Sequence, residues 1–313
     1  MGNDLEKVEL DSADLAADDA PIAYLERIRS WYLALGYETP YRWAHFQDVP
    51  FAPLGKPLPE CVIGLVTTAA PYRPGSGDQG PGAPYNGAAK FFSVYSGDTA
   101  GDPDLRISHV AIDRAHTTAE DIGSHFPLAA LRSLAERGVI GAVGPRYHGL
   151  PTERSQKKTV ENLVPEIVSR CRADSVDAVL LVANCPVCHQ SAALAARALE
   201  EAGISTIVMG CAKDIVEHVG VPRFLFSDFP LGNAAGRPND PASKLRTAEL
   251  AVRLLSEAPG PRTTVRSPLK WAGAAGWKQD YCNADRLSSE ELAERRRAFD
   301  RSKRDAKNAQ QAG

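Results

Sequence analysis

Strands and helices alternate along the middle of the chain, and this alternation limits the fold more than any other feature of the sequence. Apolar runs at 176–183 and 205–209 are typical of buried strands, and the segments that follow carry apolar residues at helical spacing. Another strand is predicted at 223–229, then a helix that Pro241 opens and Asp240 caps. Because such units pair their strands in parallel, we expect an α/β fold: a doubly wound, mostly parallel, Rossmann-like sheet with helices on both faces.

The first half of the chain follows the same pattern less regularly. Strands are predicted at 61–68 and 139–143, and the apolar residues of 105–112 suggest another. The segment 69–103 is rich in glycine and proline and matches no phosphate-binding loop, so we interpret it as an active-site cover or a mobile loop. Further helices are predicted at 21–35, 127–138 and 161–173.

The two ends of the chain differ from its middle in composition. Residues 1–19 carry seven acidic side chains against one lysine, and we expect a disordered acidic arm because few large apolar side chains can offset the entropy of ordering. Residues 20–260 form the predicted α/β domain, either as one body or as two lobes that divide near residue 150. Residues 261–313 are expected to be an extension, irregular at first and then a charged helix that Ser288 and Glu291 cap.

Charge and hydropathy argue against two classes of partner. The net charge of -3 offers no basic footprint for nucleic acid, and no apolar run reaches the roughly 18 residues that a membrane span needs. The N-terminus lacks the basic and apolar regions of a signal peptide, so we expect a cytoplasmic protein. In that reducing compartment, six cysteines are typical of thiols, metal ligands or a catalytic pair rather than of a disulfide framework.

The strongest chemical motif is the C-x-x-C pair of Cys185 and Cys188, with His189 directly behind it. The pair follows the strand predicted at 176–183 and opens a helix, which is where α/β sheets place functional groups. With Pro186 as first helical residue, Cys185 is the expected N-cap, and the unpaired N–H groups and helix dipole favour its thiolate. Cys188 lies one turn on and can close a disulfide with Cys185. His189 is either a base or charge partner for the thiolate, or a structural histidine.

A metal or iron–sulfur site is the alternative hypothesis for the same motif. Cys211 follows the next predicted strand, so parallel neighbours would bring it to the same edge of the sheet. The ligands would be Cys185, Cys188, His189 and Cys211. Because the sequence has no second C-x-x-C pair and no finger-type pair of histidines, it favours a redox pair over structural zinc. A buried inert thiol is an equally good interpretation of Cys211.

Other polar residues lie at or after predicted strand ends, in loops that converge on this edge if the sheet is parallel. Each of them alone is more often structural than catalytic. The candidates for substrate contact at this rim are Arg106, His109, Asp113, His116, His148, Cys211 and Asn233.

Several separated blocks between about Trp43 and Leu255 carry a resemblance to a known family. They are VPFAPLGKPLPE with VIGLVTTAA, GDPDLRIS, FPLAALRSLAERGVIGAV, CPVCH, and Cys211 with FPLGN. In this order the blocks resemble the selenoprotein B family of glycine, sarcosine, betaine and D-proline reductases, and the D-proline branch in particular. In that branch the motif begins with selenocysteine, so Cys185 occupies the selenium position and Cys188 that of the partner cysteine.

The resemblance implies reductive cleavage of a carbon–heteroatom bond in a small molecule. Cys185 would attack the carbon or receive the substrate fragment, and Cys188 would release the product by forming a disulfide. We expect no cofactor on the chain itself, an external thiol or thioredoxin-like reductant that resets the pair, and a homo-oligomer. The family usually works with a separate pyruvoyl-containing subunit that anchors the substrate amine.

Cysteine in place of selenocysteine changes the kind of reaction that we expect. A cysteine thiol is less ionised at neutral pH, so the substitution favours an easier reaction than the original C–N cleavage. A non-catalytic subunit of a reductase complex is a further alternative.

Overall fold

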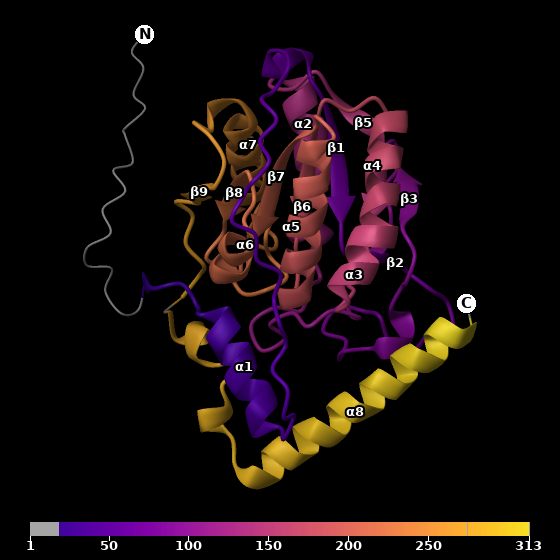
Figure 1. Cartoon of the computed structure of the whole chain (residues 1–313), viewed down its shortest axis with the longest axis vertical. Helices are drawn as coiled ribbons and strands as arrows, with labels where there is room; N and C mark the ends of the chain where they lie inside the picture. The colour runs from indigo at the N-terminus through magenta and orange to yellow at the C-terminus, as the bar shows by residue number, and fades with distance from the viewer. Residues whose placement is uncertain (1–18, 274, 313) are drawn as a thin grey trace.

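The computed structural model describes residues 19–273 and 275–312, and residues 1–18 of the predicted acidic arm lie outside this part. Its body is one seven-stranded sheet (Figure 1). The strands are β1 (Val62–Thr67), β3 (Tyr95–Asp98), β5 (Ala142–Gly149), β6 (Ala178–Val182), β7 (Ser205–Gly210), β8 (Arg223–Phe226) and β9 (Thr263–Arg266). Their order is β3-β5-β1-β6-β7-β8-β9, and only the edge strand β3 is antiparallel to its neighbour.

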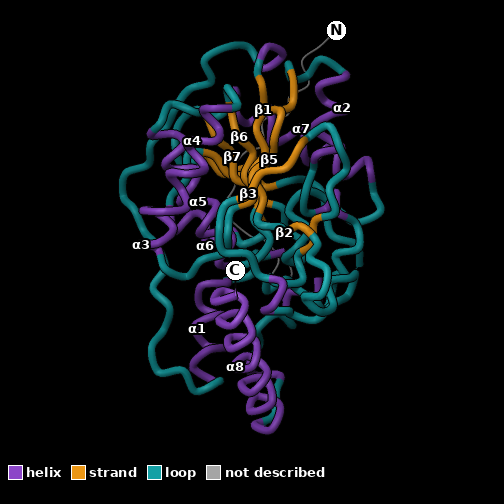
Figure 2. Tube along the Cα trace, turned by 90° about the vertical axis from the view of Figure 1, so that its right-hand side faces the viewer, coloured by secondary structure: helices purple, strands orange, loops and turns teal. Residues whose placement is uncertain are grey.

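Helices cover both faces of the sheet, and this confirms the predicted doubly wound α/β fold. One face carries α4 (Val164–Ala173), α5 (Pro186–Glu201) and α6 (Lys213–Val219), and the other carries α2 (Leu128–Glu136) and α7 (Pro241–Glu257). Figure 2 shows the two layers on either side of the strands. The first turns before α4 are a short helix, α3 (Gln156–Lys158), and a π-helical stretch, Thr159–Leu163.

Two further helices lie beneath the carboxyl ends of the strands (Figures 1 and 2). The first, α1 (Tyr24–Ala34), is held there by Asp214 of α6, which accepts from the backbone N–H of Leu25 at 2.7 Å. The second, α8 (Ser289–Ala312), begins at the predicted capping box, in which Glu291 accepts from the backbone and hydroxyl of Ser288 at 2.8 and 2.7 Å.

The last helix packs closely on the loops at this end of the molecule. Gly87 lies directly against the backbone of α8. The approach is so close that a Cβ at this position would clash with Ser302 and Ala306. Phe299 of α8 stacks edge-on against Tyr32, with ring centroids 5.4 Å apart, and the Arg154 guanidinium lies 5.3 Å from the Phe299 centroid. The helix therefore joins α1 to two loops that follow strands of the sheet.

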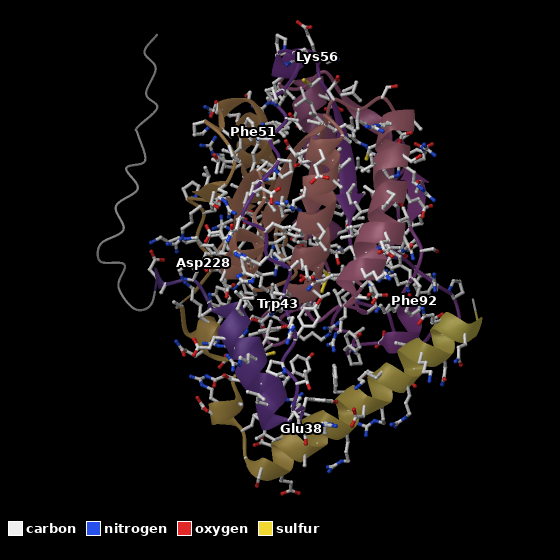
Figure 3. All side chains as sticks on the ribbon, viewed as in Figure 1. Glu38, Trp43, Phe51, Lys56, Phe92 and Asp228 are labelled. Carbon is white, nitrogen blue, oxygen red and sulfur yellow. A yellow bond between two sulfur atoms is a disulfide. The ribbon has the colours of Figure 1, made fainter. Side chains whose placement is uncertain are left out.

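The segment between β9 and α8 is held by one partly buried carboxylate. Asp228, which Figure 3 labels above α1, accepts from Arg266 at 2.8 Å and from Lys278 at 2.6 Å. Arg266 also pairs with Asp19 at 2.7 Å. At the opposite end of the sheet, the labelled Lys56 pairs with Asp177 at 2.9 Å (Figure 3).

Four sequence predictions need correction. The strand predicted at 139–143 lies instead at Ala142–Gly149. The segment 105–112 contains only the two-residue β4 (Leu105–Arg106), paired with β2 (Ala70–Pro71) in a separate small sheet. The residues after β4 form turns whose apolar side chains enter the core, so their pattern reflects burial rather than a strand. The range 261–287 is not wholly irregular, because it contains β9, which pairs with β8. The predicted strand at 223–229 ends at Phe226.

The main sheet contains strands from both sides of residue 150 and one strand beyond residue 260. Among the described residues, every helix is too short or too polar to cross a lipid bilayer.

A buried ion pair lies between α5 and β8. Glu200 accepts from the Arg223 guanidinium and from the Thr206 hydroxyl, each at 2.8 Å, and from the backbone N–H of Ala52. Arg223 also donates to the carbonyl of Ala52 at 2.9 Å and lies over the ring of Phe51, which Figure 3 labels. The pair therefore anchors the segment that leads into β1.

We predict that Arg223→Met lowers the free energy of unfolding by about 3–5 kcal/mol, because it leaves the Glu200 carboxylate buried without its cation. Urea unfolding measures this loss. The matched control is Arg253→Met, which removes the exposed pair with Glu257 on α7 and should change stability by less than about 1 kcal/mol. Equal losses in the two variants would contradict a structural role for the buried pair.

Candidate functional site

The cysteine pair lies at the junction of β6 and α5. The strand ends at Val182, and Cys185 is the N-cap of α5, with extended backbone and Pro186 at the first helical position. The Cys185 sulfur accepts from the backbone N–H of Cys188 at 3.2 Å. The predicted N-cap is confirmed, and its sulfur lies where the first turn of the helix presents unpaired N–H groups.

The structure joins Cys185 and Cys188 in a disulfide, with Cα atoms 4.9 Å apart. Both are buried, at 3% and 0% exposure. The Thr152 hydroxyl, from the loop after β5, lies 3.2 Å from the Cys188 sulfur and can donate to it, because a disulfide sulfur carries no hydrogen. The pair can therefore store two electrons as a dithiol, and its second sulfur already has a polar neighbour.

His189 is fully buried, and both of its ring nitrogens have partners. Nδ1 donates to the carbonyl of Cys185 at 2.7 Å, while Nε2 accepts from the backbone N–H groups of Cys211 and Ala212 at 2.8 and 3.0 Å. Gly210 lies against the ring and leaves no room for a side chain. Burial lowers the pKa of His189 to about 4. At neutral pH the imidazole is uncharged, and both of its nitrogens are hydrogen-bonded to the backbone. These surroundings favour a structural histidine over a charge partner for a thiolate.

Cys211 lies at the same edge of the sheet, because β7 neighbours β6 and its loop is bound through His189. Burial raises the pKa of the Cys211 thiol well above its usual range, although backbone N–H groups of Phe229 and Asn233 face the sulfur. It is a free cysteine. These surroundings favour an inert thiol over a second nucleophile.

The side chains around the cysteine pair do not form the ligand set that a metal site would need. His189 has no ring nitrogen left for coordination, since both take part in hydrogen bonds to the backbone. Within residues 19–273 and 275–312, no group of three or more His, Cys, Asp or Glu side chains could hold a metal ion.

His109 is buried and belongs to a polar cluster around Thr68. Its Nε2 lies 3.2 Å from the carbonyl of Thr68, at the end of β1. The Thr68 hydroxyl accepts from the side-chain amide of Asn184, also at 3.2 Å. Asn184 directly precedes Cys185, so Thr68 links His109 to the cysteine pair.

Two predicted rim residues hold the C-terminal segment instead. The Asp113 carboxylate lies 3.0 Å from Nδ1 of His116, whose Nε2 lies 3.1 Å from Asp280. Burial raises the pKa of Asp113. Asn233 is also buried and is used within its own loop, where its amide donates to the carbonyl of Pro230 at 3.0 Å.

Arg106 and His148 are occupied away from the cysteine pair. Arg106 of β4 pairs with Asp104 at 2.9 Å. The ring of His148, on β5, faces the Ser96 hydroxyl at 2.8 Å and Asp174 at 3.0 Å, and burial lowers its pKa. We find no contact that brings either side chain to the sulfur atoms in the described part of the chain.

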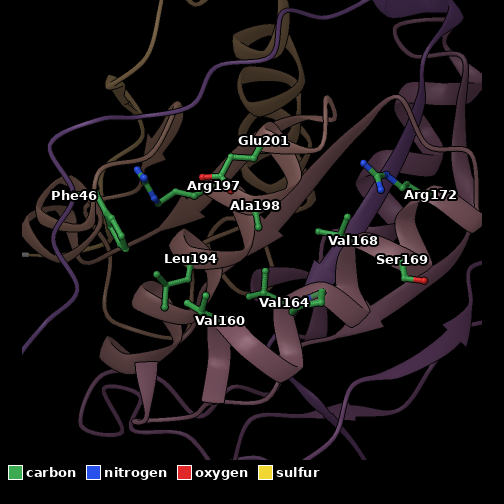
Figure 4. A pocket seen from close by; sticks show the side chains of 11 residues that line it. Phe46, Val160, Val164, Val168, Ser169, Arg172, Leu194, Arg197, Ala198 and Glu201 are labelled. Carbon is green, nitrogen blue, oxygen red and sulfur yellow. The ribbon is translucent and has the colours of Figure 1, made fainter. Parts of the chain in front are cut away.

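A surface pocket of about 540 Å³ lies elsewhere, on the outer side of α4 and α5 (Figure 4). Its lining includes the apolar Val160, Val164 and Leu194 and the charged Arg172 and Glu201, which Figure 4 labels. The cysteine pair does not line it. The pair is instead buried at the carboxyl edge of the sheet.

Three residues of the site were not among the sequence predictions. Thr68, Thr152 and Asn184 each lie within three residues of a strand's carboxyl end. The rule that places Cys185 at this edge applies equally to them. The sequence could therefore have predicted that these residues lie at this edge, but it could not have predicted their contacts with one another.

Fold and site together define an α/β protein with a disulfide-forming cysteine pair at the carboxyl edge of its sheet. The chain is 32% identical to D-proline reductase subunit gamma of Acetoanaerobium sticklandii over 223 residues, which are 71% of this chain and 89% of that protein. With this match, the chain belongs to the selenoprotein B family of reductase subunits, as its sequence blocks suggested.

Two more distant relatives support the same family. The chain is 27% and 25% identical to glycine reductase complex component B subunit gamma of Carboxydothermus hydrogenoformans and of Peptoclostridium acidaminophilum, over 67% and 70% of its length. It spans about half the length of these two relatives, 49% and 50%. Neither a protein-family model nor a solved structure matches the chain.

The buried His189 leads to a pH prediction. Its pKa is lowered from 6.5 to about 4 on folding, so the neutral ring stabilises the fold above pH 6.5 and this contribution is lost as the pH falls toward 4. His189→Gln keeps an acceptor but cannot titrate. Between pH 6.5 and 4, the wild type should lose about 3 kcal/mol more unfolding free energy than the variant. Parallel pH profiles in urea unfolding would show that His189 does not titrate as described.

Proposed function

We propose that the protein is a thiol-dependent reductase subunit that cleaves a carbon–heteroatom bond of a small molecule. The observation that carries the proposal is the position of Cys185. It is the N-cap of α5, within disulfide distance of Cys188, in a chain whose relative is a D-proline reductase subunit. The helix terminus would stabilise the Cys185 thiolate in the reduced protein.

The proposed reaction consumes the dithiol and balances without another bound group. The Cys185 thiolate attacks the carbon that bears the heteroatom, and the heteroatom leaves with one proton. The Cys188 thiolate then attacks the Cys185 sulfur, which releases the carbon with its electron pair to take the second proton. The products are R–H, H–X and the Cys185–Cys188 disulfide, and an external dithiol reductant restores the pair.

The Thr152 hydroxyl supports the second half of this reaction. It lies 3.2 Å from the Cys188 sulfur and can donate to the thiolate that forms there. Donation to a thiolate favours its ionised form, which is the form that attacks the Cys185 sulfur.

Partner subunits are part of the proposal. The two glycine reductase relatives are named as subunits of a complex, and the D-proline reductase relative is itself named as a subunit. We propose that this chain also works with a partner subunit that anchors the substrate, in the manner that the family resemblance implies with a pyruvoyl group. Homo-oligomerisation and a cytoplasmic location stay predictions.

Thiol reactivity tests the nucleophile directly. After reduction, limiting iodoacetamide at neutral pH should label Cys185 before the other cysteines, and peptide mass spectrometry locates the adduct. Cys185→Ser should lower this labelling to the level of the remaining thiols. The matched control is Cys171→Ser, which removes a buried helix cysteine whose thiol pKa burial raises to about 12. Preferential labelling at Cys171 or Cys211 would contradict the assignment of Cys185.

The resolving thiol has a separate test. Incubation of the reduced wild-type protein with the small-molecule fraction of a cell extract should re-form the disulfide. Cys188→Ser cannot complete the second step, so it should accumulate a substrate fragment on Cys185, visible as an added mass. If neither protein changes and Cys185→Ser leaves the reductase complex active, the chain is a scaffold subunit.

A further inference from the structure

A second cluster of potentially reactive side chains lies at the edge strand β3, and the strand β1 separates it from the β6 strand that leads to the cysteine pair. Ser96 on β3 is the cross-strand neighbour of His148 on β5, and its hydroxyl lies 2.8 Å from His148 Nδ1. His148 Nε2 lies 3.0 Å from Oδ2 of Asp174, the C-cap of α4. A serine, a histidine and an aspartate therefore follow one another in the order that nucleophilic catalysis uses.

The charges around His148 determine where its ring proton lies. Nε2 carries the proton, because a bare lone pair on this nitrogen would otherwise face the Asp174 carboxylate. Burial lowers the pKa of His148, so the ring is neutral at neutral pH and Nδ1 is an acceptor. The Ser96 hydroxyl then donates to the one ring atom that can take its proton.

Asp174 is held in place by a second partner. The Nε atom of Arg146 donates to Oδ1 of Asp174 at 2.9 Å, which leaves Oδ2 on the side of the histidine. In the described part of the chain Oδ2 has no well-aligned hydrogen bond, so its contact with the ring is one of charge and proximity. The carboxylate can therefore stabilise a positive charge that forms on His148.

The Ser96 oxygen also has a cation beside it. It accepts from the Arg170 guanidinium of α4 at 2.6 Å, and Arg170 is itself held by Glu166 at 2.5 Å and by the carbonyl of Val94 at 3.2 Å. A positive charge at this distance stabilises negative charge on the oxygen. The oxygen thus has both an acceptor for its proton and a cation for the charge that remains.

Ser96 is more accessible than its base. Strand β3 has a neighbour on one side only, and Figure 2 views the molecule from the side of this strand. Ser96 is half-buried, whereas His148 is 2% exposed. A half-buried hydroxyl at an open edge of the sheet suits a small acyl group.

We propose that Ser96 is a nucleophile that accepts small acyl groups from activated esters, with His148 as its base and Asp174 as the residue that positions the base. The Ser96 oxygen bonds to the acyl carbon, Nδ1 of His148 takes the hydroxyl proton, and the alcohol leaves with that proton as its bond to the carbon breaks. Water then attacks the same carbon and gives a proton to His148, which returns it to Ser96 as the acid is released. No oxidant or reductant is consumed, so the activity is separate from the proposed reductase.

Two probes test the nucleophile on the oxidised full-length protein, in which the pair of Cys185 and Cys188 presents no thiolate. A fluorophosphonate should form an adduct on Ser96, and p-nitrophenyl acetate should leave an acetyl group there, both located by peptide mass spectrometry. Ser96→Ala should lose both adducts. The matched control is Ser133→Ala, which removes a half-buried serine of α2 on the opposite face of the sheet and should keep both.

Two variants test the base and its positioning. His148→Gln should slow the labelling of Ser96 at least about 100-fold, the usual contribution of a general base. Burial lowers the pKa of His148 and the Asp174 charge raises it, while Arg146 and Arg170 lower it further. Asp174→Asn should therefore move the acid limb of the labelling rate to lower pH, which a merely structural aspartate would not do. Circular dichroism checks that each variant is folded.

The outcomes are distinct. Labelling of Ser96 that His148→Gln slows as stated supports the proposal. The absence of a Ser96 adduct from the wild-type protein with both probes overturns it, and so does labelling that His148→Gln leaves unchanged, because the two side chains then only join β3 to β5. None of these results bears on the reductase, whose tests use the reduced cysteine pair.

Discussion

His189 ties the carboxyl ends of β6 and β7 together through backbone groups alone. Its ring donates to the carbonyl of Cys185 and accepts from the N–H groups of Cys211 and Ala212. These hydrogen bonds fix the turn that makes Cys185 an N-cap, and Cys188 follows from it by one helical turn. Backbone N–H groups of the loop after β8 face the Cys211 sulfur, so this loop also packs against the turn that His189 holds.

The same edge is covered from below. α1, α8 and the loops around Gly87 and Arg154 pack on one another by aromatic and backbone contacts. The cysteine pair is buried, although it lies where α/β sheets usually present open sites. The pocket on α4 and α5 does not include either cysteine.

The central sheet was predictable from the sequence, because buried parallel strands and helical spacing are strong local signals. The edge strands β3 and β9 were not, since each is four residues long and at best half-buried, which leaves no continuous apolar run. Residues 105–112 misled in the opposite way: Ile107, Val110 and Ile112 enter the core from turns. A run of apolar residues indicates that a segment is buried. Only the length of the run and the spacing of its apolar residues then distinguish a strand from a buried loop.

The candidate site divides along the same line. The N-cap at Cys185 followed from Pro186 and from the strand before it, both of which are local. The role of His189 was not readable, because its partners at Cys211 and Ala212 lie 22 and 23 residues further along the chain. The pairing of Thr68 with Asn184 spans 116 residues and exists only because β1 and β6 are neighbours. The sequence also could not show that Arg106 and His148 contact other residues and not the cysteine pair, because these contacts depend on tertiary packing.

Both sulfur atoms of the pair belong to one helical turn, from the N-cap of α5 to its third residue. Their Cα atoms are 4.9 Å apart, within the ordinary range for disulfides, while the backbone keeps helix geometry. The disulfide therefore fits the first turn of α5 without a break in the helix. If the protein cycles between disulfide and dithiol as proposed, a partner would have to detect the change at the sulfur atoms themselves.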